Sequence, residues 1–211
     1  MSKKEEFLKM MNFRHACKLF DTTKKISDED IHYILEVAHK SPSSFGMEAW
    51  KFLVITNNEL REELKPFCWN QPQITTCSHL VVVLAGIDTL KVENGKVRSQ
   101  FMRRNLPAEK LDAYMKIYTS HLSDTLSSDE NIYQWSARQT YIAAANMMNA
   151  AACIGIDSCP IEGFEKENVE KVLKLDTSKF QVAMLLPLGY RINEQPTQIR
   201  SSFQSVVEFI K

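Results

Sequence analysis

The segment HLVVVLAG, residues 79–86, decides the fold class, because it is the strongest β-strand signal in the chain. An uninterrupted apolar run of this length that is rich in valine is typical of a strand buried on both faces. The segments KFLVIT (51–56) and VAMLLPL (182–188) are predicted to be further core strands. Because these strands are few and irregularly spaced between helical segments, the sequence indicates an α+β fold and not a regular βαβ array.

Helical patterns occupy most of the chain between these strands. The clearest one begins after Ser27, a good N-cap, and should end at Ser41-Pro42, since the residue before a proline avoids helical geometry. Residues 131–155 are predicted to form a long central helix, whose alanines would let a second helix approach closely. Further helices are predicted at residues 3–11, 58–65, 96–126 and 166–175.

The overall charge limits the kinds of partner that the protein can have. Its 211 residues contain 26 Lys and Arg against 26 Asp and Glu, so the formal net charge is zero. This balance argues against nucleic-acid binding through a general basic surface, but it is compatible with a small basic pocket. The length favours one domain, residues 1–211. No G-x-G-x-x-G follows a predicted strand and no P-loop motif occurs, so neither type of nucleotide site is supported.

The cysteines and the N-terminus favour a cytoplasmic protein. The five cysteines include no C-x-x-C pair, and the N-terminal residues are charged where an export signal needs an apolar run. No apolar run is suited to spanning a membrane, so no membrane partner is expected. The five histidines lack metal-ligand spacing, and no metal site is predicted. The tail at 191–211 is polar with an apolar end, which needs a surface to dock on, such as a partner subunit.

Four short segments contain residue types that suit ligand binding. In RHACK (14–18), two cations four residues apart could both face an anion, although a solvated charged turn has the same composition. In SPSSFG (41–46), small residues could bring backbone N–H groups close to a ligand, or the segment could simply end a helix. The serines have no associated histidine and acid in the sequence, so a hydrolase is not supported.

The other two segments carry amides and a tight turn. In WNQPQ (69–73), amides beside an aromatic ring suit a flat heterocycle that offers donors and acceptors, with a surface turn as the alternative. In CPIEGF (159–164), proline and glycine would fix a turn between a short strand and a helix. Its N–H groups could point into a site, or it could be a plain connecting loop.

Taken in order, these segments resemble the FMN-dependent nitroreductase family, in its oxygen-insensitive NAD(P)H nitroreductase branch. The matching motifs are R-H-x-x-K-x-F-D from residue 14, S-P-S-S from 41, N-x-x-Q from 70 and P-I-E-G-F from 160. The resemblance covers about residues 10–200. It implies a mostly antiparallel central sheet flanked by helices, with a long central helix. It also implies a homodimer with an exchanged C-terminal tail and FMN at the subunit interface.

The resemblance assigns cofactor-binding roles to individual residues. Arg14 and Arg200 would bind the FMN phosphate, and Lys18 would lie near the pyrimidine edge of the flavin. The backbone of Glu162 and Gly163 would bond the redox-active nitrogen. The remaining implied cofactor contacts are His15, Ala16, Pro42, Ser43, Ser44, Gly46, Asn70, Gln73, Pro160, Ile161 and Gln198.

Three positions depart from the family pattern. Serine is common where Ala16 stands, and lysine is common where Gln73 and Gln198 stand. The loss of two cations should weaken phosphate and flavin-anion binding and lower the flavin potential. Cys17, beside Lys18, is either a reactive thiol with a lowered pKa or an inert packed thiol.

The implied reaction moves two electrons from NADH or NADPH through FMN to nitro compounds, quinones or similar small acceptors by a ping-pong mechanism. No side chain need act as a nucleophile, and Lys18 would stabilise negative charge on the reduced flavin. Candidates for the acceptor pocket, each equally well explained as an aromatic core residue, are Phe45, Tyr114, Tyr118 and His121. The alternatives are a flavin, enone or pteridine reductase on the same fold, or a non-catalytic flavin-binding protein.

Overall fold

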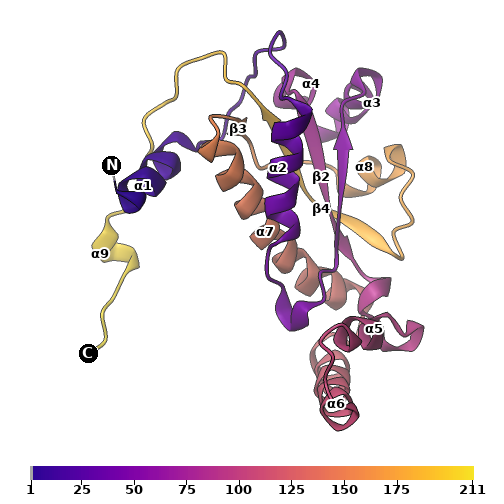
Figure 1. The fold of residues 1–211 in the computed structure, drawn as a ribbon. Helices are drawn as coiled ribbons and strands as arrows, with labels where there is room; N and C mark the ends of the chain where they lie inside the picture. The colour runs from indigo at the N-terminus through magenta and orange to yellow at the C-terminus, as the bar shows by residue number, and fades with distance from the viewer. Residues whose placement is uncertain (1) are drawn as a thin grey trace.

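A computed structural model describes residues 2–211 and contains a four-stranded sheet with the order β1-β2-β4-β3 (Figure 1). All neighbouring strands are antiparallel. The three predicted core strands are confirmed, and a short fourth strand lies directly before the turn at 159–164, where the sequence predicted one. The strands are β1 (Trp50–Ile55), β2 (His79–Gly86), β3 (Asp157–Ser158) and β4 (Phe180–Gly189).

The segment β2 lies inside the sheet, and all eight of its residues are buried. Its residue Val82 lies opposite Leu53 on one side and Leu185 on the other. Side chains alternate between the two faces of a strand, so β2 supplies Leu80, Val82 and Leu84 to one core and Val81 and Val83 to another. A continuous apolar run is therefore needed here, because both faces of the sheet are covered by helices.

Two helices, α2 (Asp28–His39) and α7 (Asp129–Cys153), pack on one face of the sheet (Figure 1). The side chain of Ser27 caps α2 as predicted, accepting a hydrogen bond from the backbone N of Asp30 at 3.1 Å. Three alanines of α7 in this core are fully buried: Ala143, Ala144 and Ala151. The predicted long central helix is thus confirmed. The opposite face is covered by α3 (Asn58–Leu64), α4 (Gln73–Thr76) and α8 (Lys166–Val172).

The segment predicted as one helical region at 96–126 is divided into α5 (Lys96–Met102) and α6 (Ala108–Thr125). The break follows from Asn105, whose φ of 49° is left-handed, and from Pro107, which precedes the first turn of α6. The helix predicted at 166–175 also ends early, at Val172, because Lys174 has a left-handed φ of 52°. Single 3₁₀ turns occur at η1 (Ser44–Gly46), η2 (Lys65–Cys68), η3 (Asp88–Leu90) and η4 (Val92–Asn94).

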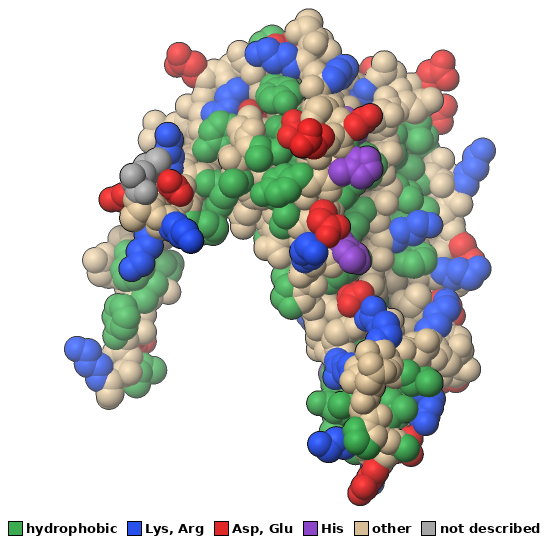
Figure 2. Space-filling model, viewed as in Figure 1, with side chains coloured by type: hydrophobic (Ala, Val, Ile, Leu, Met, Phe, Trp, Pro, Cys, Tyr) green, Lys and Arg blue, Asp and Glu red, His purple; other side chains and the backbone are tan. Residues whose placement is uncertain are grey.

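The two ends of the chain together form an arm. It consists of α1 (Lys3–Phe13) and the C-terminal tail with α9 (Phe203–Val206), and it stands away from the sheet on the side opposite α5 and α6 (Figure 1). Figure 2 shows a hollow between this arm and the rest of the molecule. The apolar end of the tail is solvent-exposed, with Phe209 at 75% and Ile210 at 92%. Across residues 2–211, no helix combines the length and apolarity that a membrane span requires.

Candidate functional site

The segment 14–18 runs alongside β3, at one edge of the sheet. Ala16 forms a parallel bridge with Ser158, and the backbone N of Cys17 donates to the carbonyl of Ser158 at 3.1 Å. Arg14 directly follows α1, and Lys18 lies exposed beyond the buried Cys17. The two cations predicted to face an anion therefore occupy one short, extended segment that the sheet edge supports. A cavity of about 210 Å³ opens beside it, lined by residues 15–19 together with Arg191 and tail residues.

A buried ion pair anchors this segment. Arg191, at the end of β4, places its Nη2 2.6 Å from Oδ1 of Asp157 and donates from its Nε to Oδ2 at 3.0 Å. It also donates to the carbonyl of Phe13 at 3.2 Å, and its guanidinium lies 4.1 Å from the centre of the Phe13 ring. The side chain of His15 lies 3.6 Å from Asp157. Burial lowers the pKa of His15, and the positive charge of Arg191 lowers it further.

The sequence interpretation missed both Arg191 and Asp157. Asp157 lies next to the predicted turn at 159–164, but a lone carboxylate before Ser158 carries no ligand signal. Only the pairing of β3 with the end of β4 brings the two charges together.

The tail is tied to the same segment by two glutamines. Gln198 donates from its Nε2 to the carbonyls of Arg14 at 2.7 Å and Asn12 at 2.9 Å, and Gln195 donates to Asn12 at 2.6 Å. Gln198 stands where the family often has lysine. In this chain its side-chain amide binds the backbone carbonyls of Asn12 and Arg14. Arg200 follows two residues later and is exposed, so the tail brings it to the same end of the molecule as Arg14.

A second set of contacts links Lys18 to the two amide-rich and turn segments. The Nζ of Lys18 lies 3.6 Å from the Sγ of Cys159, and the Nε2 of Gln73 lies 3.8 Å from the same sulfur. Gln73 donates to the side chain of Gln71 at 2.8 Å, and Gln71 donates to the carbonyl of Gly163 at 2.8 Å. Three of the four predicted segments therefore meet. Gln73 itself is only 1% exposed, so its amide lies beneath this site and supports it.

The turn at 160–163 is held above β4 by an antiparallel bridge between Ile161 and Leu185. Glu162 projects outward, and its carboxylate accepts a hydrogen bond from the hydroxyl of Tyr141 at 2.8 Å. Gly163 is packed against the exposed ring of Trp69, where an added Cβ would lie 2.6 Å from ring carbons. A side chain at 163 would therefore have to displace the exposed Trp69 ring. Asn70, next to Trp69, is exposed and has a left-handed φ of 52°.

The loop at 42–46 lies elsewhere. It leads into Trp50, which pairs with Ala85, whereas the segment 14–18 lies at the end of the sheet where His79 pairs with Leu188. The six-residue step along β2 from His79 to Ala85 separates the two positions by roughly 20 Å. One chain therefore does not bring Pro42, Ser43, Ser44 and Gly46 to the other predicted cofactor residues.

Local contacts hold this loop in shape. The backbone N of Ser44 donates to Gln139 of α7 at 2.9 Å, and the hydroxyl of Ser43 accepts from the backbone N of Glu48 at 2.9 Å. Phe45 and Gly46 both have left-handed φ values, 54° and 63°.

The four predicted acceptor-pocket residues gather near this loop. The ring of Phe45 lies 5.2 Å from Tyr118 and 5.8 Å from His121, and Tyr114 joins the group through Phe101 at 5.7 Å. Tyr118 is fully buried, and its hydroxyl donates to the carbonyl of Leu90 at 2.8 Å, so it is a core residue and not an accessible lining residue. Phe45, Tyr114 and His121 are partly exposed, so their side chains are accessible to solvent.

The reactive alternative for Cys17 is wrong. Its thiol is 2% exposed and donates to the carbonyl of Leu19, and burial raises its pKa to about 11. Lys18 points instead toward Cys159. All five cysteines are free, and Cys153 is the exposed one.

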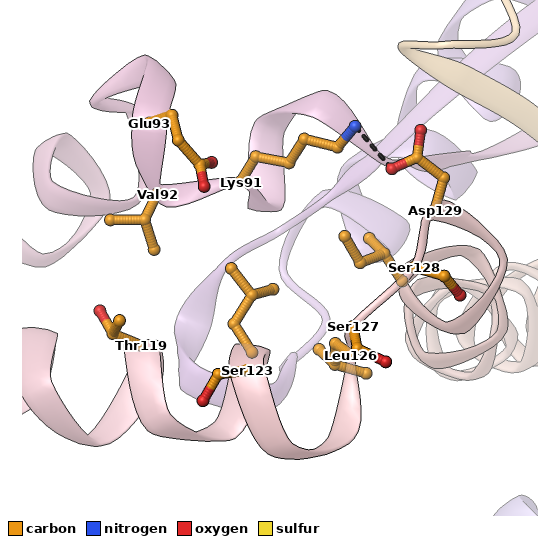
Figure 3. Close-up of a pocket in the computed structure, with 11 residues that line it drawn as sticks. Lys91, Val92, Glu93, Thr119, Ser123, Leu126, Ser127, Ser128 and Asp129 are labelled. Carbon is orange, nitrogen blue, oxygen red and sulfur yellow. Dashed lines mark ion pairs between the residues drawn. The ribbon is translucent and has the colours of Figure 1, made fainter.

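A further cavity, of about 480 Å³, lies between η4, α6 and the start of α7 (Figure 3). Lys91 and Asp129 form an ion pair of 2.6 Å at its rim, and Leu126 contributes to its apolar lining. None of the sequence-predicted site residues lines it. Its position between η4 and α6 separates it from the segment 14–18.

A family model and a curated relative both match this chain as a nitroreductase. The family model described as "Nitroreductase family" matches residues 11–190. A protein of Bacillus subtilis (strain 168), YfkO, which carries the name of an NAD(P)H nitroreductase, is 38% identical, with 98% of each chain covered.

Two solved structures share the fold. One, from Exiguobacterium sibiricum 255-15, is named as a nitroreductase in complex with FMN; it has a TM-score of 0.81 and 24% identity, with 97% of each chain covered. The other is the enone reductase CLA-ER of gut-bacterial fatty acid saturation, with a TM-score of 0.81 and 19% identity, covering 97% of this chain and 98% of that one.

Proposed function

The chain belongs to the nitroreductase family, and from that premise we propose that it is an FMN-dependent oxidoreductase. It transfers two electrons from NADH or NADPH to a nitro compound, a quinone or a similar small acceptor. The single observation that carries this proposal is the meeting of Lys18, Gln73 and the turn at 160–163 beside the Arg14 segment.

The donor set fits FMN. Within residues 2–211, the side chains of Arg14, Lys18 and Arg200 have no carboxylate within ion-pair distance, although the chain as a whole is neutral. Cations without acid partners at one end of the molecule are suited to a phosphate group. The exposed Trp69 and the amide of Asn70 suit a flat ring with hydrogen-bonding edges.

FMN supplies the redox chemistry, since it can accept a hydride from the nicotinamide and deliver two electrons to the acceptor. The protein binds and orients it. Arg14 and Arg200 hold the phosphate, and Lys18 places a positive charge where negative charge develops at the pyrimidine edge. The backbone of Glu162 and Gly163 holds the redox-active nitrogen. Gln71 supports that turn by donating to the carbonyl of Gly163.

The proposed site is completed by a second copy of the chain. In one chain, the loop at 42–46 and the aromatic group around Phe45 lie at one end of the sheet, and the segment 14–18 lies at the other end. A partner must therefore supply one half of the site. The exposed apolar tail and the hollow beside it (Figure 2) are suited to this exchange, with Ile199 at 87% and Phe203 at 61% exposure. The tail of one protomer would lie along its partner.

Donor and acceptor would use one pocket in turn, which is a ping-pong mechanism, because the nicotinamide must leave before the acceptor can reach the same face. Phe45, Tyr114 and His121 of the partner would line that pocket. The protein would act in the cytoplasm, where its five free cysteines stay reduced.

A second candidate function is enone reduction, since CLA-ER shares the fold. Steady-state rates over nitro compounds, quinones, enones, pteridines and free flavin separate these reactions. A yellow protein that oxidises neither NADH nor NADPH with any acceptor would instead be a flavin-binding protein. A purified chain that binds no added FMN would contradict the electron-transfer proposal altogether.

A further inference from the structure

A second, smaller cavity carries positive charge that the proposed flavin site does not use. It has a volume of about 280 Å³ and lies where β1 ends and β2 begins, lined by Lys25, Thr56, Asn58, Arg61, Ser78 and His79. β1 and β3 form opposite edges of the sheet, and His79 is two strand spacings, roughly 10 Å, from Ser158 of the flavin-site edge. The cavity is therefore separate from the segment 14–18.

Arg61 is the central feature of this cavity. It is 2% exposed, and within residues 2–211 no carboxylate lies within ion-pair distance of it. A buried guanidinium without a charged partner is costly, because its hydration is lost and no opposite charge replaces it. A buried charge at this position calls for a compensating negative charge.

The hydrogen bonds of Arg61 leave one donor unused. Nη1 donates to the carbonyl and sulfur of Cys77, and Nη2 donates to the carbonyl of Thr56 and the side chain of Asn58. A guanidinium has five N–H groups, so only the Nε–H remains. Among residues 2–211, Nε has no hydrogen-bond partner. A carboxylate that needs two parallel guanidinium donors is therefore not accommodated here.

His79 offers a second donor. Ser78 Oγ accepts from the backbone N of Ile26 at 2.8 Å and lies 3.0 Å from Nδ1 of His79. The Ser78 hydroxyl can donate to Nδ1, and in that tautomer Nε2 carries the proton of the neutral ring. Burial lowers the pKa of His79, and the charges of Arg61 and Lys25 lower it further, while Asp28 opposes them. The potential around His79 is therefore positive.

We propose that the cavity bounded by Lys25, Arg61 and His79 binds a phosphate group, either as inorganic phosphate or as a phosphomonoester. Three separate N–H-bearing residues line the cavity in place of a single free guanidinium fork, which suits a tetrahedral group with oxygens in several directions. Lys25 contributes a point charge from the exposed side. The six lining residues include no Asp or Glu that would repel the ligand.

The test is a proton NMR titration of His79 in the full chain, with and without saturating FMN. Potassium phosphate is compared with potassium chloride at equal ionic strength. Phosphate should raise the pKa of His79, because a bound anion favours the protonated ring. AMP replaces phosphate in a second arm, and tighter binding of AMP identifies a phosphomonoester as the ligand. No change in the titration of His79 with either probe would overturn the site.

Two lysine variants make the test specific without disturbing Arg61, whose substitution would also break the contacts with Cys77. Lys25→Gln removes a charge at the cavity and should weaken phosphate binding at least threefold. Lys24→Gln removes the adjacent exposed lysine, which pairs with Asp21 at 3.6 Å and does not line the cavity, and should leave binding unchanged. Equal effects of both variants would show non-specific charge screening and contradict the site. Because His79 reports on this cavity alone, a failure of FMN binding would not alter the outcome.

Discussion

The guanidinium Nη2 of Arg191 lies 2.6 Å from Oδ1 of Asp157, and this buried pair joins the segments that surround the proposed phosphate site. Arg191 also contacts the carbonyl and ring of Phe13 and donates to Gln195 of the tail at 2.8 Å. One ion pair thus fixes the end of β4, the short strand β3, the start of the segment 14–18 and the tail.

Asp157→Asn should lower the free energy of unfolding by about 3 kcal/mol, because it leaves Arg191 largely buried without its charge partner. The measurement is urea denaturation at pH 7. Asp112→Asn is the matched control, since it breaks the exposed pair with Arg98 at 3.0 Å and should change stability little. Similar losses in the two variants would contradict a structural role for the buried pair.

Arg14→Ala should weaken FMN binding about tenfold or more, since a charge-assisted hydrogen bond to phosphate contributes about 1.5–3 kcal/mol. Fluorescence titration of the apoprotein with FMN measures this. Arg98→Ala removes an exposed arginine on α5 and serves as the control. An unchanged FMN affinity in Arg14→Ala would refute the phosphate assignment.

Stability should fall as the pH drops from neutral toward 5. Burial lowers the folded-state pKa of both His15 and His79, so the folded chain binds fewer protons than the unfolded chain in this range. Their contribution is complete above the ordinary histidine pKa of 6.5 and is lost as the pH falls through the lowered values. Urea midpoints at pH 7.5 and 5.5 test this, and a His15→Gln/His79→Gln double variant should show a weaker dependence. A urea midpoint that rises on acidification would contradict this prediction.

Thiol reagents should modify Cys153 well before Cys17. Cys153 is exposed, whereas Cys17 is buried with a pKa of about 11. Brief treatment of the native protein at pH 7.5, followed by peptide mapping, distinguishes the two sites. Equally fast labelling of Cys17 would show that its segment opens readily.

Local patterns in the sequence predicted much of this fold. The apolar run at 79–86 and the capped helix after Ser27 are recognisable because burial and capping each impose a local requirement on residue type. The helical region predicted at 96–126 is divided into α5 and α6, since the break depends on Asn105 and Pro107 within an otherwise helical composition. The short strand predicted before the turn at 159–164 is β3, which has only two residues and depends on its pairing with β4.

The candidate site was only partly predictable for the same reason. The resemblance identified Lys18, Gln73 and the turn at 160–163, which the structure brings together. It gave no indication of Arg191 or Asp157, whose roles arise from strands far apart in the chain. Gln73 lies under the site, which a residue-by-residue match does not reveal. Tyr118 was grouped correctly with Phe45, but its burial follows from the packing of α6.

FMN-dependent electron transfer is tested most directly by the visible spectrum of the purified protein, followed by anaerobic titration with NADH or NADPH. We expect a yellow protein with one FMN per chain, whose flavin absorbance is bleached by one equivalent of the nicotinamide and restored by a nitro or quinone acceptor. A colourless protein that takes up no added FMN would contradict it.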